Sequence, residues 1–215
     1  MNLPRLNREF YDSFAAEFSR SREAINPGIG RALRGLDLSA VLDVGCGDGR
    51  VSKILPRECK YVGLDFSAQL IGRNAREAAT FTLADFSSPL PVAAQIFSTV
   101  LCFATLHHLP ERLPLMRELA RVARPNGVVV VSVWQITHNA RMQKKIVEDL
   151  GNGDYILDWK SGGQGLRFVH EVTETELRGL VSEAGLDVRE MFRSDGKSGD
   201  LGLYAILAPT PALPR

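Results

Sequence analysis

The stretch that decides the fold is residues 41–50, VLDVGCGDGR, in which an apolar run leads into glycines at alternate positions. The apolar run ends at Val44, and Gly45, Gly47 and Gly49 follow it. Glycines let the backbone turn sharply and approach a ligand closely. In an open parallel sheet, ligands bind beyond the carboxyl ends of the strands. The stretch therefore predicts a strand followed by a ligand-binding loop, whose ligand is a dinucleotide or another adenosine-containing cofactor.

Working outward from this stretch, short apolar runs alternate with helical patterns. The runs lie at residues 40–44, 60–64, 80–84, 97–103 and 127–134. Helical patterns separate them at residues 48–56, 67–79 and 111–123. This alternation is typical of a parallel sheet with helices on both faces. Two last runs, at 186–192 and 201–207, predict a hairpin at the sheet edge. We therefore predict an α/β fold with a doubly wound, Rossmann-like sheet.

The rest of the chain supplies a cap, an insertion and a tail. Residues 8–35 read as an N-terminal helical cap, and residues 138–150 read as another helix. Residues 151–170 hold five glycines without a clear period, which predicts an insertion loop. We expect one domain over residues 1–208 and a flexible tail over 209–215, where proline is frequent.

The composition limits the classes of function. The chain has 215 residues with 26 basic and 25 acidic side chains, so a strongly basic nucleic-acid surface is not predicted, although a local patch stays open. Its three cysteines form no CxxC pair, so we expect neither disulfides nor a metal site, and a reduced, cytoplasmic location. No apolar run is long enough to cross a membrane, and the N-terminus does not resemble a signal peptide.

The charges in the glycine loop argue against a dinucleotide. The dinucleotide fingerprint G-x-G-x-x-G needs a sixth-position glycine, where this chain has Arg50. Asp43 and Asp48 add negative charge beside the loop, which disfavours a pyrophosphate and suits a ligand with an ammonium or sulfonium group. A hydride-transferring enzyme therefore remains only as an alternative.

Acids at the ends of the next two runs point to an adenosine. Asp65 ends the second run, where a carboxylate can accept both ribose hydroxyls. Asp85 ends the third run and can accept from an adenine amino group, while its neighbour Phe86 can cover the ring. S-adenosylmethionine combines an adenosine with a sulfonium cation, and it matches this set of groups.

At this point the chain resembles the class I S-adenosylmethionine-dependent methyltransferases. The motifs VLDVGCGDG, VGLDFS, LADF, FATLHHL and LARVARPNGVVVVSVW occur in the family's order over residues 38–135. The resemblance implies a seven-stranded sheet whose last strand is antiparallel. It also implies that S-adenosylmethionine is the cofactor. The cofactor-binding residues expected on this basis are Tyr11, Asp43, Gly45, Cys46, Gly47, Asp65, Phe66, Asp85, Phe86 and Ala104.

A narrower resemblance concerns the methyl acceptor. The segments YDSFAAEFSRSR, DYILDWK and RFVHEVTETEL are similar to segments of the tRNA wobble-uridine methyltransferases, which esterify a 5-carboxymethyl group. The chain departs from that family at Asp158, Phe168 and Val169. The resemblance implies a tRNA substrate, and it raises a small activator subunit as a partner.

The acceptor side is expected near the end of the fourth strand. Arg22, His107 and His108 are the residues we predict to act on the acceptor, as holders of an oxygen or, for the histidines, as a general base. A carboxylate acceptor is already ionised and needs placement rather than a base. Tyr11 and Arg22 can instead hold the carboxylate end of the cofactor, and this choice stays open.

Two alternatives and one surface stay open as well. The chain can be a methyltransferase for a small molecule, such as a quinone precursor or secondary metabolite, or a cofactor-binding module without turnover. A rim of basic residues can bind phosphate or be an ordinary solvated face. The rim consists of Arg141, Lys144, Lys145, Lys160 and Arg167.

Overall fold

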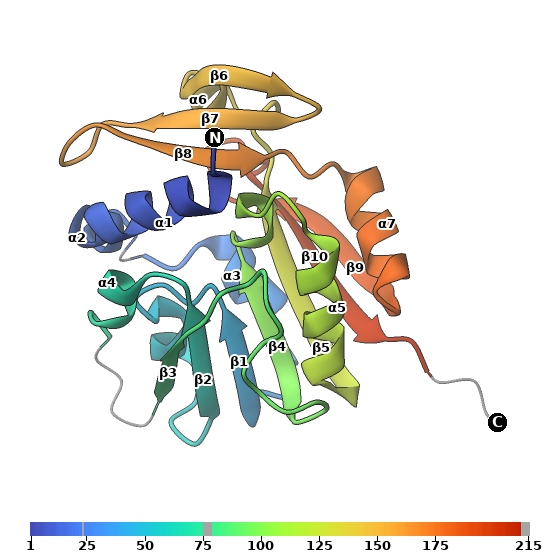
Figure 1. Ribbon diagram of the computed structural model, residues 1–215. Helices are drawn as coiled ribbons and strands as arrows, with labels where there is room; N and C mark the ends of the chain where they lie inside the picture. Colours follow the sequence, from blue (N-terminus) through green and yellow to red (C-terminus); the bar gives the residue numbers. More distant parts are fainter. Residues whose placement is uncertain (23, 75–78, 212–215) are drawn as a thin grey trace.

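The main sheet has seven strands in the order β3-β2-β1-β4-β5-β10-β9 (Figure 1). The computed structural model of the chain describes all residues except 23, 75–78 and 212–215. The strands are β1 (Ala40–Val44), β2 (Lys60–Asp65), β3 (Thr80–Leu83), β4 (Phe97–Phe103), β5 (Ala123–Trp134), β9 (Leu186–Ser194) and β10 (Gly202–Pro209). The first five are parallel to one another, and β10 runs antiparallel to both β5 and β9. The predicted Rossmann-like sheet with an antiparallel last strand is confirmed, and so is the terminal hairpin at its edge.

Helices cover both faces of this sheet because alternate side chains of each strand point to opposite sides. Leu42 and Val100 belong to the core under α5 (Leu113–Val122) and α7 (Glu174–Glu183). Val41 and Leu101, their neighbours in sequence, belong to the core under α3 (Pro27–Ala32) and the 3-10 helix η1 (Arg50–Ile54). Nearly continuous apolar strands are therefore needed, as the sequence shows.

The N-terminal helices lie across the carboxyl ends of the strands. They are α1 (Leu3–Ser13) and α2 (Ala15–Arg20), and short α4 (Ala68–Ile71) packs against both. The cap begins at residue 3 rather than 8, because the Asn2 side chain accepts a bond from the backbone N–H of Arg5 and caps α1. Within the described parts of the chain, no helix is long and apolar enough to span a membrane.

A second, three-stranded antiparallel sheet corrects two predictions. It consists of β6 (Ile146–Gly151), β7 (Asp154–Trp159) and β8 (Gly165–His170), and it packs on α1. The helix expected over 138–150 is wrong, because only α6 (Ala140–Gln143) is helical there. The loop expected over 151–170 is also wrong. Residues 151–153, Gly-Asn-Gly, all have positive φ and make the tight turn that joins β6 to β7.

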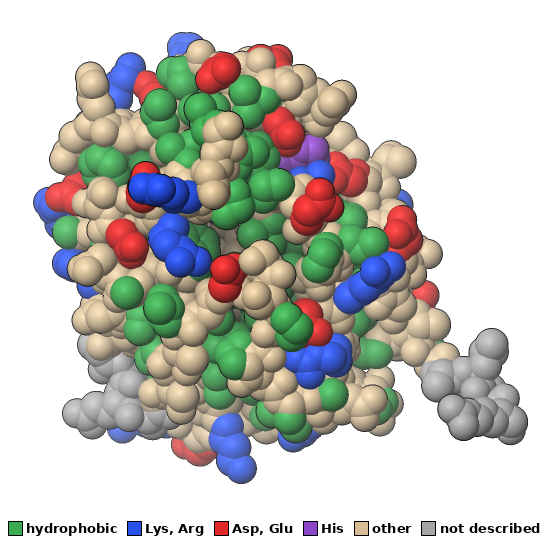
Figure 2. Space-filling view, viewed as in Figure 1, with side chains coloured by type: hydrophobic (Ala, Val, Ile, Leu, Met, Phe, Trp, Pro, Cys, Tyr) green, Lys and Arg blue, Asp and Glu red, His purple; other side chains and the backbone are tan. Residues whose placement is uncertain are grey.

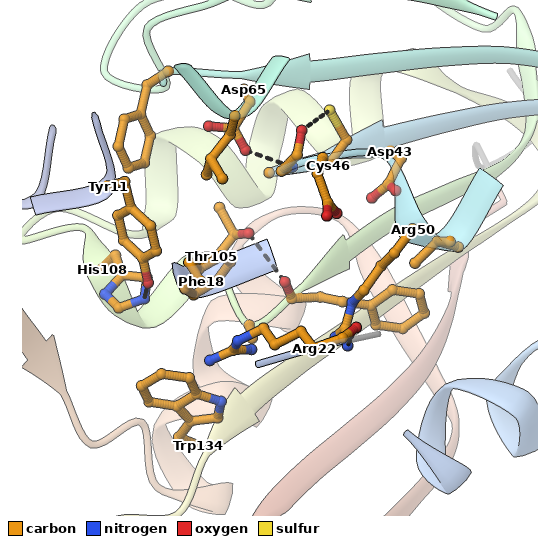
Figure 3. Close-up of a pocket in the computed structure, with 18 residues that line it drawn as sticks. Tyr11, Phe18, Arg22, Asp43, Cys46, Arg50, Asp65, Thr105, His108 and Trp134 are labelled. Atoms are coloured by element: carbon orange, nitrogen blue, oxygen red, sulfur yellow. Dashed lines mark hydrogen bonds between the residues drawn. The ribbon is translucent and has the colours of Figure 1, made fainter. Parts of the chain in front are cut away.

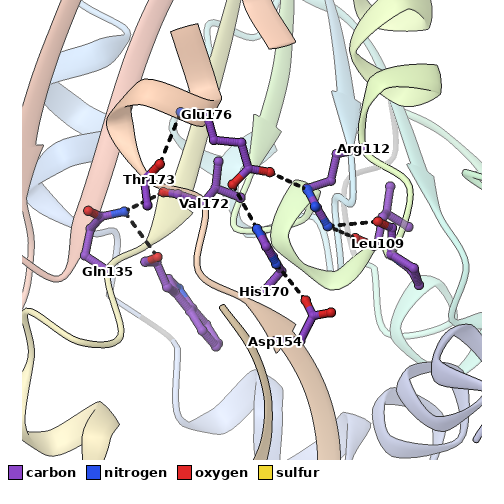
Figure 4. Close-up of polar contacts among 10 residues, drawn as sticks. Leu109, Arg112, Gln135, Asp154, His170, Val172, Thr173 and Glu176 are labelled. Atoms are coloured by element: carbon purple, nitrogen blue, oxygen red, sulfur yellow. Dashed lines mark hydrogen bonds and ion pairs between the residues drawn. The ribbon is translucent and has the colours of Figure 1, made fainter. Parts of the chain in front are cut away.

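A partly buried polar cluster around His170 fixes this second sheet to the main fold (Figure 4). The His170 ring lies between Asp154 of β7, at 2.6 Å, and Glu176 of α7, at 2.8 Å. Glu176 also accepts from Arg112 at 2.9 Å, and Arg112 donates to the carbonyl of Leu109, also at 2.9 Å. The cluster thereby connects β7, β8 and α7 to η2 (Leu106–His108), the turn after β4.

Candidate functional site

A cavity lies at the carboxyl ends of β1, β2 and β4, beneath α1 and α2 (Figure 3). Its empty volume is about 690 Å³, including space open to solvent. Most of the predicted site residues line it, although they come from distant parts of the sequence. They are Tyr11, Arg22, Asp43, Gly45, Cys46, Gly47, Asp65, Phe66, Ala104 and His108. In Figure 3 the acids Asp43 and Asp65 lie on one side, and Arg22 and Trp134 lie across the cavity.

The glycine loop brings backbone to the cavity wall. Gly45 has φ +80°, and a Cβ placed on it would lie 1.8 Å from the Thr105 hydroxyl oxygen. Gly47 has φ +57°, and a Cβ placed there would have no atom within 4 Å. Gly45 is therefore required by close packing against Thr105, whereas Gly47 leaves open space in front of the backbone.

Asp65 is positioned to hold a ligand with paired hydroxyls. Its side chain is buried, and its two oxygens accept from the backbone N–H of Gly47, at 2.7 Å, and of Ser67, at 2.9 Å. A carboxylate has about four acceptor positions, so these bonds leave acceptor capacity for a ligand. Burial raises the pKa of Asp65 to about 6, while the backbone bonds oppose that rise.

A second acid, Asp43, lies in the same wall. It is buried, and the Tyr61 hydroxyl donates to it at 2.7 Å. Burial raises the pKa of Asp43 to about 7, and repulsion by Asp65 adds to the rise. Asp48 also lines the cavity. Free acceptor positions on Asp65, open space at Gly47 and this excess of carboxylates fit an adenosine that carries a cationic sulfonium.

The shifted pKa of Asp65 predicts opposite pH effects on binding and folding. If Asp65 holds the ribose as the sequence predicts, cofactor affinity should fall about tenfold per pH unit below pH 6, because protonation of Asp65 weakens it as an acceptor of the ribose hydroxyls. The folded pKa lies above the unfolded value of about 4, so this group stabilises the free protein below pH 4. That stability is lost as the pH rises through 6. Calorimetry and thermal melts between pH 4.5 and 8 test both trends.

Asp65→Asn is the matched control for that experiment, because it keeps the side-chain size and removes the ionisation. In this variant, affinity and stability should no longer change with pH around pH 6. Any pH dependence that remains near pH 7 then comes from Asp43, whose pKa is about 7. An affinity that is constant from pH 5 to 7 in the wild type would contradict the prediction.

His108, which the sequence predicts to act on the acceptor, lines the cavity and is held in one tautomer. Its Nδ1 lies 3.0 Å from the Phe168 carbonyl oxygen, so Nδ1 carries the proton and donates. Its Nε2 therefore accepts from the Tyr11 hydroxyl, at 2.7 Å. Burial, reinforced by the nearby charge of Arg167, lowers the pKa of His108 to about 3. His108 is thus a neutral hydrogen-bonding residue and a weak base.

Arg22 enters the cavity against two aromatic rings. Its Cζ lies 4.2 Å from the Phe18 ring centroid and 5.5 Å from that of Trp134. Burial lowers the pKa of Arg22 to about 10, so the guanidinium stays charged at neutral pH. Phe18 and Trp134 line the cavity but were absent from the predicted site. Phe18 stands two helical turns after Tyr11, a spacing that could have revealed it.

The remaining predicted residues do not line the cavity. His107 is fully buried, and its Nδ1 accepts from the backbone N–H of Trp134 at 3.2 Å. Asp85 is exposed and accepts from the backbone N–H and hydroxyl of Ser87. Phe86 is buried, with its ring edge-on to Phe66 at 5.8 Å between centroids. Roles for these three in catalysis or adenine binding therefore remain predictions.

Comparison with known proteins agrees with this geometry. Residues 3–191 match the model of the family described as "Methyltransferase domain". A tRNA (carboxymethyluridine(34)-5-O)-methyltransferase of Arabidopsis thaliana is 34% identical over 141 residues, which are 62% of this chain and 34% of that protein. This chain thus spans about a third of that relative. A ubiquinone biosynthesis O-methyltransferase of Parvibaculum lavamentivorans is 25% identical over 185 residues, covering 81% of this chain and 69% of that protein.

Among solved structures, a similar chain comes from the complex between the Haloferax volcanii Trm112 methyltransferase activator and a methyltransferase. The two chains share 17% identity and superpose with a TM-score of 0.74, over 97% of this chain and 99% of that one. At this identity the likeness supports the fold. The family match over most of the chain goes further, and it shows that the chain belongs to the methyltransferase-domain family.

Proposed function

We propose that the chain methylates a carboxylate oxygen of a modified wobble uridine in tRNA. The observation that carries this proposal is that the part of the cavity around Arg22 and His108 has a positive charge but no group that is an effective base at neutral pH. Arg22 is charged there, and His108, with a pKa of about 3, is neutral. A hydroxyl acceptor needs a base to remove its proton. A carboxylic acid with a pKa of about 4 is already ionised at neutral pH and needs no base.

The roles of the residues follow from their positions. Bound S-adenosylmethionine supplies an electrophilic methyl group on its sulfonium. Asp65 and the backbone at Gly47 hold the adenosine side, and Arg22 orients the acceptor carboxylate. The rings of Phe18 and Trp134 exclude water from the space between. Such positioning can supply roughly 7–11 kcal/mol of the barrier reduction.

The tRNA substrate rests on likeness to the Arabidopsis relative and on local charge rather than on a broad basic surface. On the face drawn in Figure 2, basic side chains of the described residues stand among acidic ones. The predicted phosphate rim is also smaller than expected. Arg167 is buried, Lys160 pairs with Asp158 at 3.0 Å, and Lys145 lies over the Trp159 ring. Arg141 and Lys144 remain exposed for phosphate contact, and so does Lys160, whose ion pair with Asp158 lies at the surface.

A small activator subunit would enlarge that surface. The similar chain from Haloferax volcanii comes from a complex with the Trm112 activator, and we include a partner of this kind in the proposal. A tRNA substrate places the reaction in the cytoplasm, and the three free cysteines suit a reducing compartment.

The test is incubation with labelled methyl donor and bulk tRNA, followed by nucleoside analysis, with and without an activator. A labelled methyl ester of 5-carboxymethyluridine supports the proposal. Affinity for tRNA should also fall steeply with salt, because phosphate contacts release counterions. Label that enters only small molecules would favour the quinone-precursor alternative, to which the ubiquinone relative corresponds.

His108 gives a second, independent prediction. His108→Ala should slow methyl transfer by roughly tenfold to a hundredfold, because acceptor placement is lost with the bond to Tyr11. Cofactor affinity should stay within about threefold, since the acids that hold the adenosine lie across the cavity. The wild-type single-turnover rate with saturating cofactor should show no ionisation of His108 between pH 6 and 9. A rate that rises with a pKa near 6.5 in the wild type and not in the variant would identify His108 as a base.

A further inference from the structure

Arg167 of β8 is a buried cation without an acceptor. Its side chain is 2% exposed, and its Nε and Nη1 atoms have no hydrogen-bond partner among the described residues. Its Cζ lies 4.7 Å from the ring centroid of Trp134, 5.1 Å from that of Phe10 and 5.5 Å from that of Trp159. A guanidinium removed from water is costly unless something compensates its charge. Aromatic faces compensate part of that charge, and they leave the donors unused.

The surroundings add positive charge. Arg22 approaches the same Trp134 ring, and among the described residues no carboxylate pairs with either guanidinium. After burial itself, repulsion by Arg167 lowers the pKa of Arg22, His108 and Lys145. The region around Trp134, which lines the cavity, therefore carries positive charge that favours an anionic ligand.

We propose that Arg167 and Arg22 form an anion subsite around Trp134, which selects a methyl acceptor bearing a planar ring and a carboxylate. Arg22, which lines the cavity, contacts the carboxylate, and Arg167 is the specificity-determining residue that supplies the second charge. This inference rests on the proposed function for the acceptor's identity, but the subsite itself requires only an anionic acceptor.

The subsite also distinguishes the substrate from the product by their charge. During transfer the carboxylate oxygen bonds to the methyl carbon as the carbon–sulfur bond breaks, and that bond's electron pair stays on sulfur. The anionic acceptor becomes a neutral ester, and the cationic donor becomes a neutral thioether. The two guanidiniums thus attract the substrate and have no charge to hold in the product, which favours its release.

The test compares an acid with its neutral amide in protein loaded with S-adenosylhomocysteine. The ligands are anticodon stem-loops whose wobble uridine carries a 5-carboxymethyl or a 5-carbamoylmethyl group. Wild type should bind the acid at least about tenfold more tightly, as expected for a charge-assisted bond. Arg167→Met should lose most of this preference, because only the charge of Arg22 remains, while keeping its affinity for the amide. Arg167→Lys, which keeps the charge, should retain part of the preference.

Thermal melting separates this role from a structural one. Because Arg167→Met removes a buried, unpaired charge and keeps an unbranched side chain, the melting temperature of the free protein should be unchanged or higher. A lower melting temperature, with equal losses for acid and amide, would show that Arg167 only supports the fold and would overturn the proposal.

Small ligands distinguish failure of this inference from failure of the proposed function. Uracil-5-acetate and uracil-5-acetamide carry the same groups without RNA. If the stem-loop is neither bound nor methylated, but wild type prefers the small acid in an Arg167-dependent way, the tRNA substrate is wrong and the subsite stands. If the stem-loop is methylated and Arg167→Met keeps the acid preference, the subsite is wrong. Equal binding of acid and amide by wild type, or binding of neither, also overturns the subsite.

Discussion

Gly45→Ala is expected to destabilise the protein by about 2–5 kcal/mol and to remove measurable binding of S-adenosylhomocysteine. A left-handed backbone at a non-glycine residue costs roughly 1–2 kcal/mol, and Gly45 has φ +80°. The added methyl would lie 1.8 Å from the Thr105 hydroxyl oxygen, which donates to the Phe103 carbonyl. Overpacking of this kind costs typically 1–3 kcal/mol. Denaturant unfolding and calorimetry measure the two effects.

Other glycines provide controls of matched size. Gly179 lies in helix α7 with no atom within 4 Å of an added Cβ, so Gly179→Ala should be neutral or stabilise by up to about 1 kcal/mol. Gly47→Ala meets no atom either, but it has φ +57° and faces the cavity. It should lower cofactor affinity with a smaller loss of stability. If Gly45→Ala has the same free energy of unfolding and the same cofactor affinity as Gly179→Ala, then Gly45 is not required by close packing in the loop.

The main sheet could be predicted because its signals are local. Mostly apolar runs such as residues 40–44 are buried throughout, as expected of a parallel sheet between two helical layers. The acids at strand ends follow the same logic. The carboxyl ends of β1 and β2 meet at one edge, so Asp43 and Asp65 had to lie near each other.

The second sheet and its contacts could not be predicted in the same way. Strand β6 is almost wholly exposed, so its sequence lacks the alternation of apolar and polar residues that would indicate a strand. Arg167 looks like a surface residue in sequence, and it is buried because β8 packs on α1 and places it against Phe10, Trp134 and Trp159. His107 and His108 are adjacent, and the 3-10 turn directs only His108 to the cavity. These outcomes depend on contacts between residues far apart in sequence.

Asp65→Ala should weaken binding of S-adenosylmethionine by about 10²–10⁴-fold. Two hydroxyl bonds to a charged acceptor are worth roughly 1.5–3 kcal/mol each, and the substitution removes both. It also leaves the backbone N–H of Gly47 without its acceptor, which loosens the loop. Folding should be less affected, because the buried carboxylate that is lost resists ionisation, as its raised pKa of about 6 indicates. Isothermal titration calorimetry with the cofactor gives the affinity.

Asp85→Ala makes the same chemical change after the next strand and is the control that decides the argument. Asp85 is exposed and does not line the cavity, and its carboxylate is already engaged by Ser87. Its removal should therefore cost less than about tenfold in affinity, even if it reaches the adenine amino group through one bond. Equal losses in the two variants would mean that the cofactor lies across both strand ends. An Asp65→Ala variant with wild-type affinity would instead remove the physical basis for placing the cofactor in this cavity.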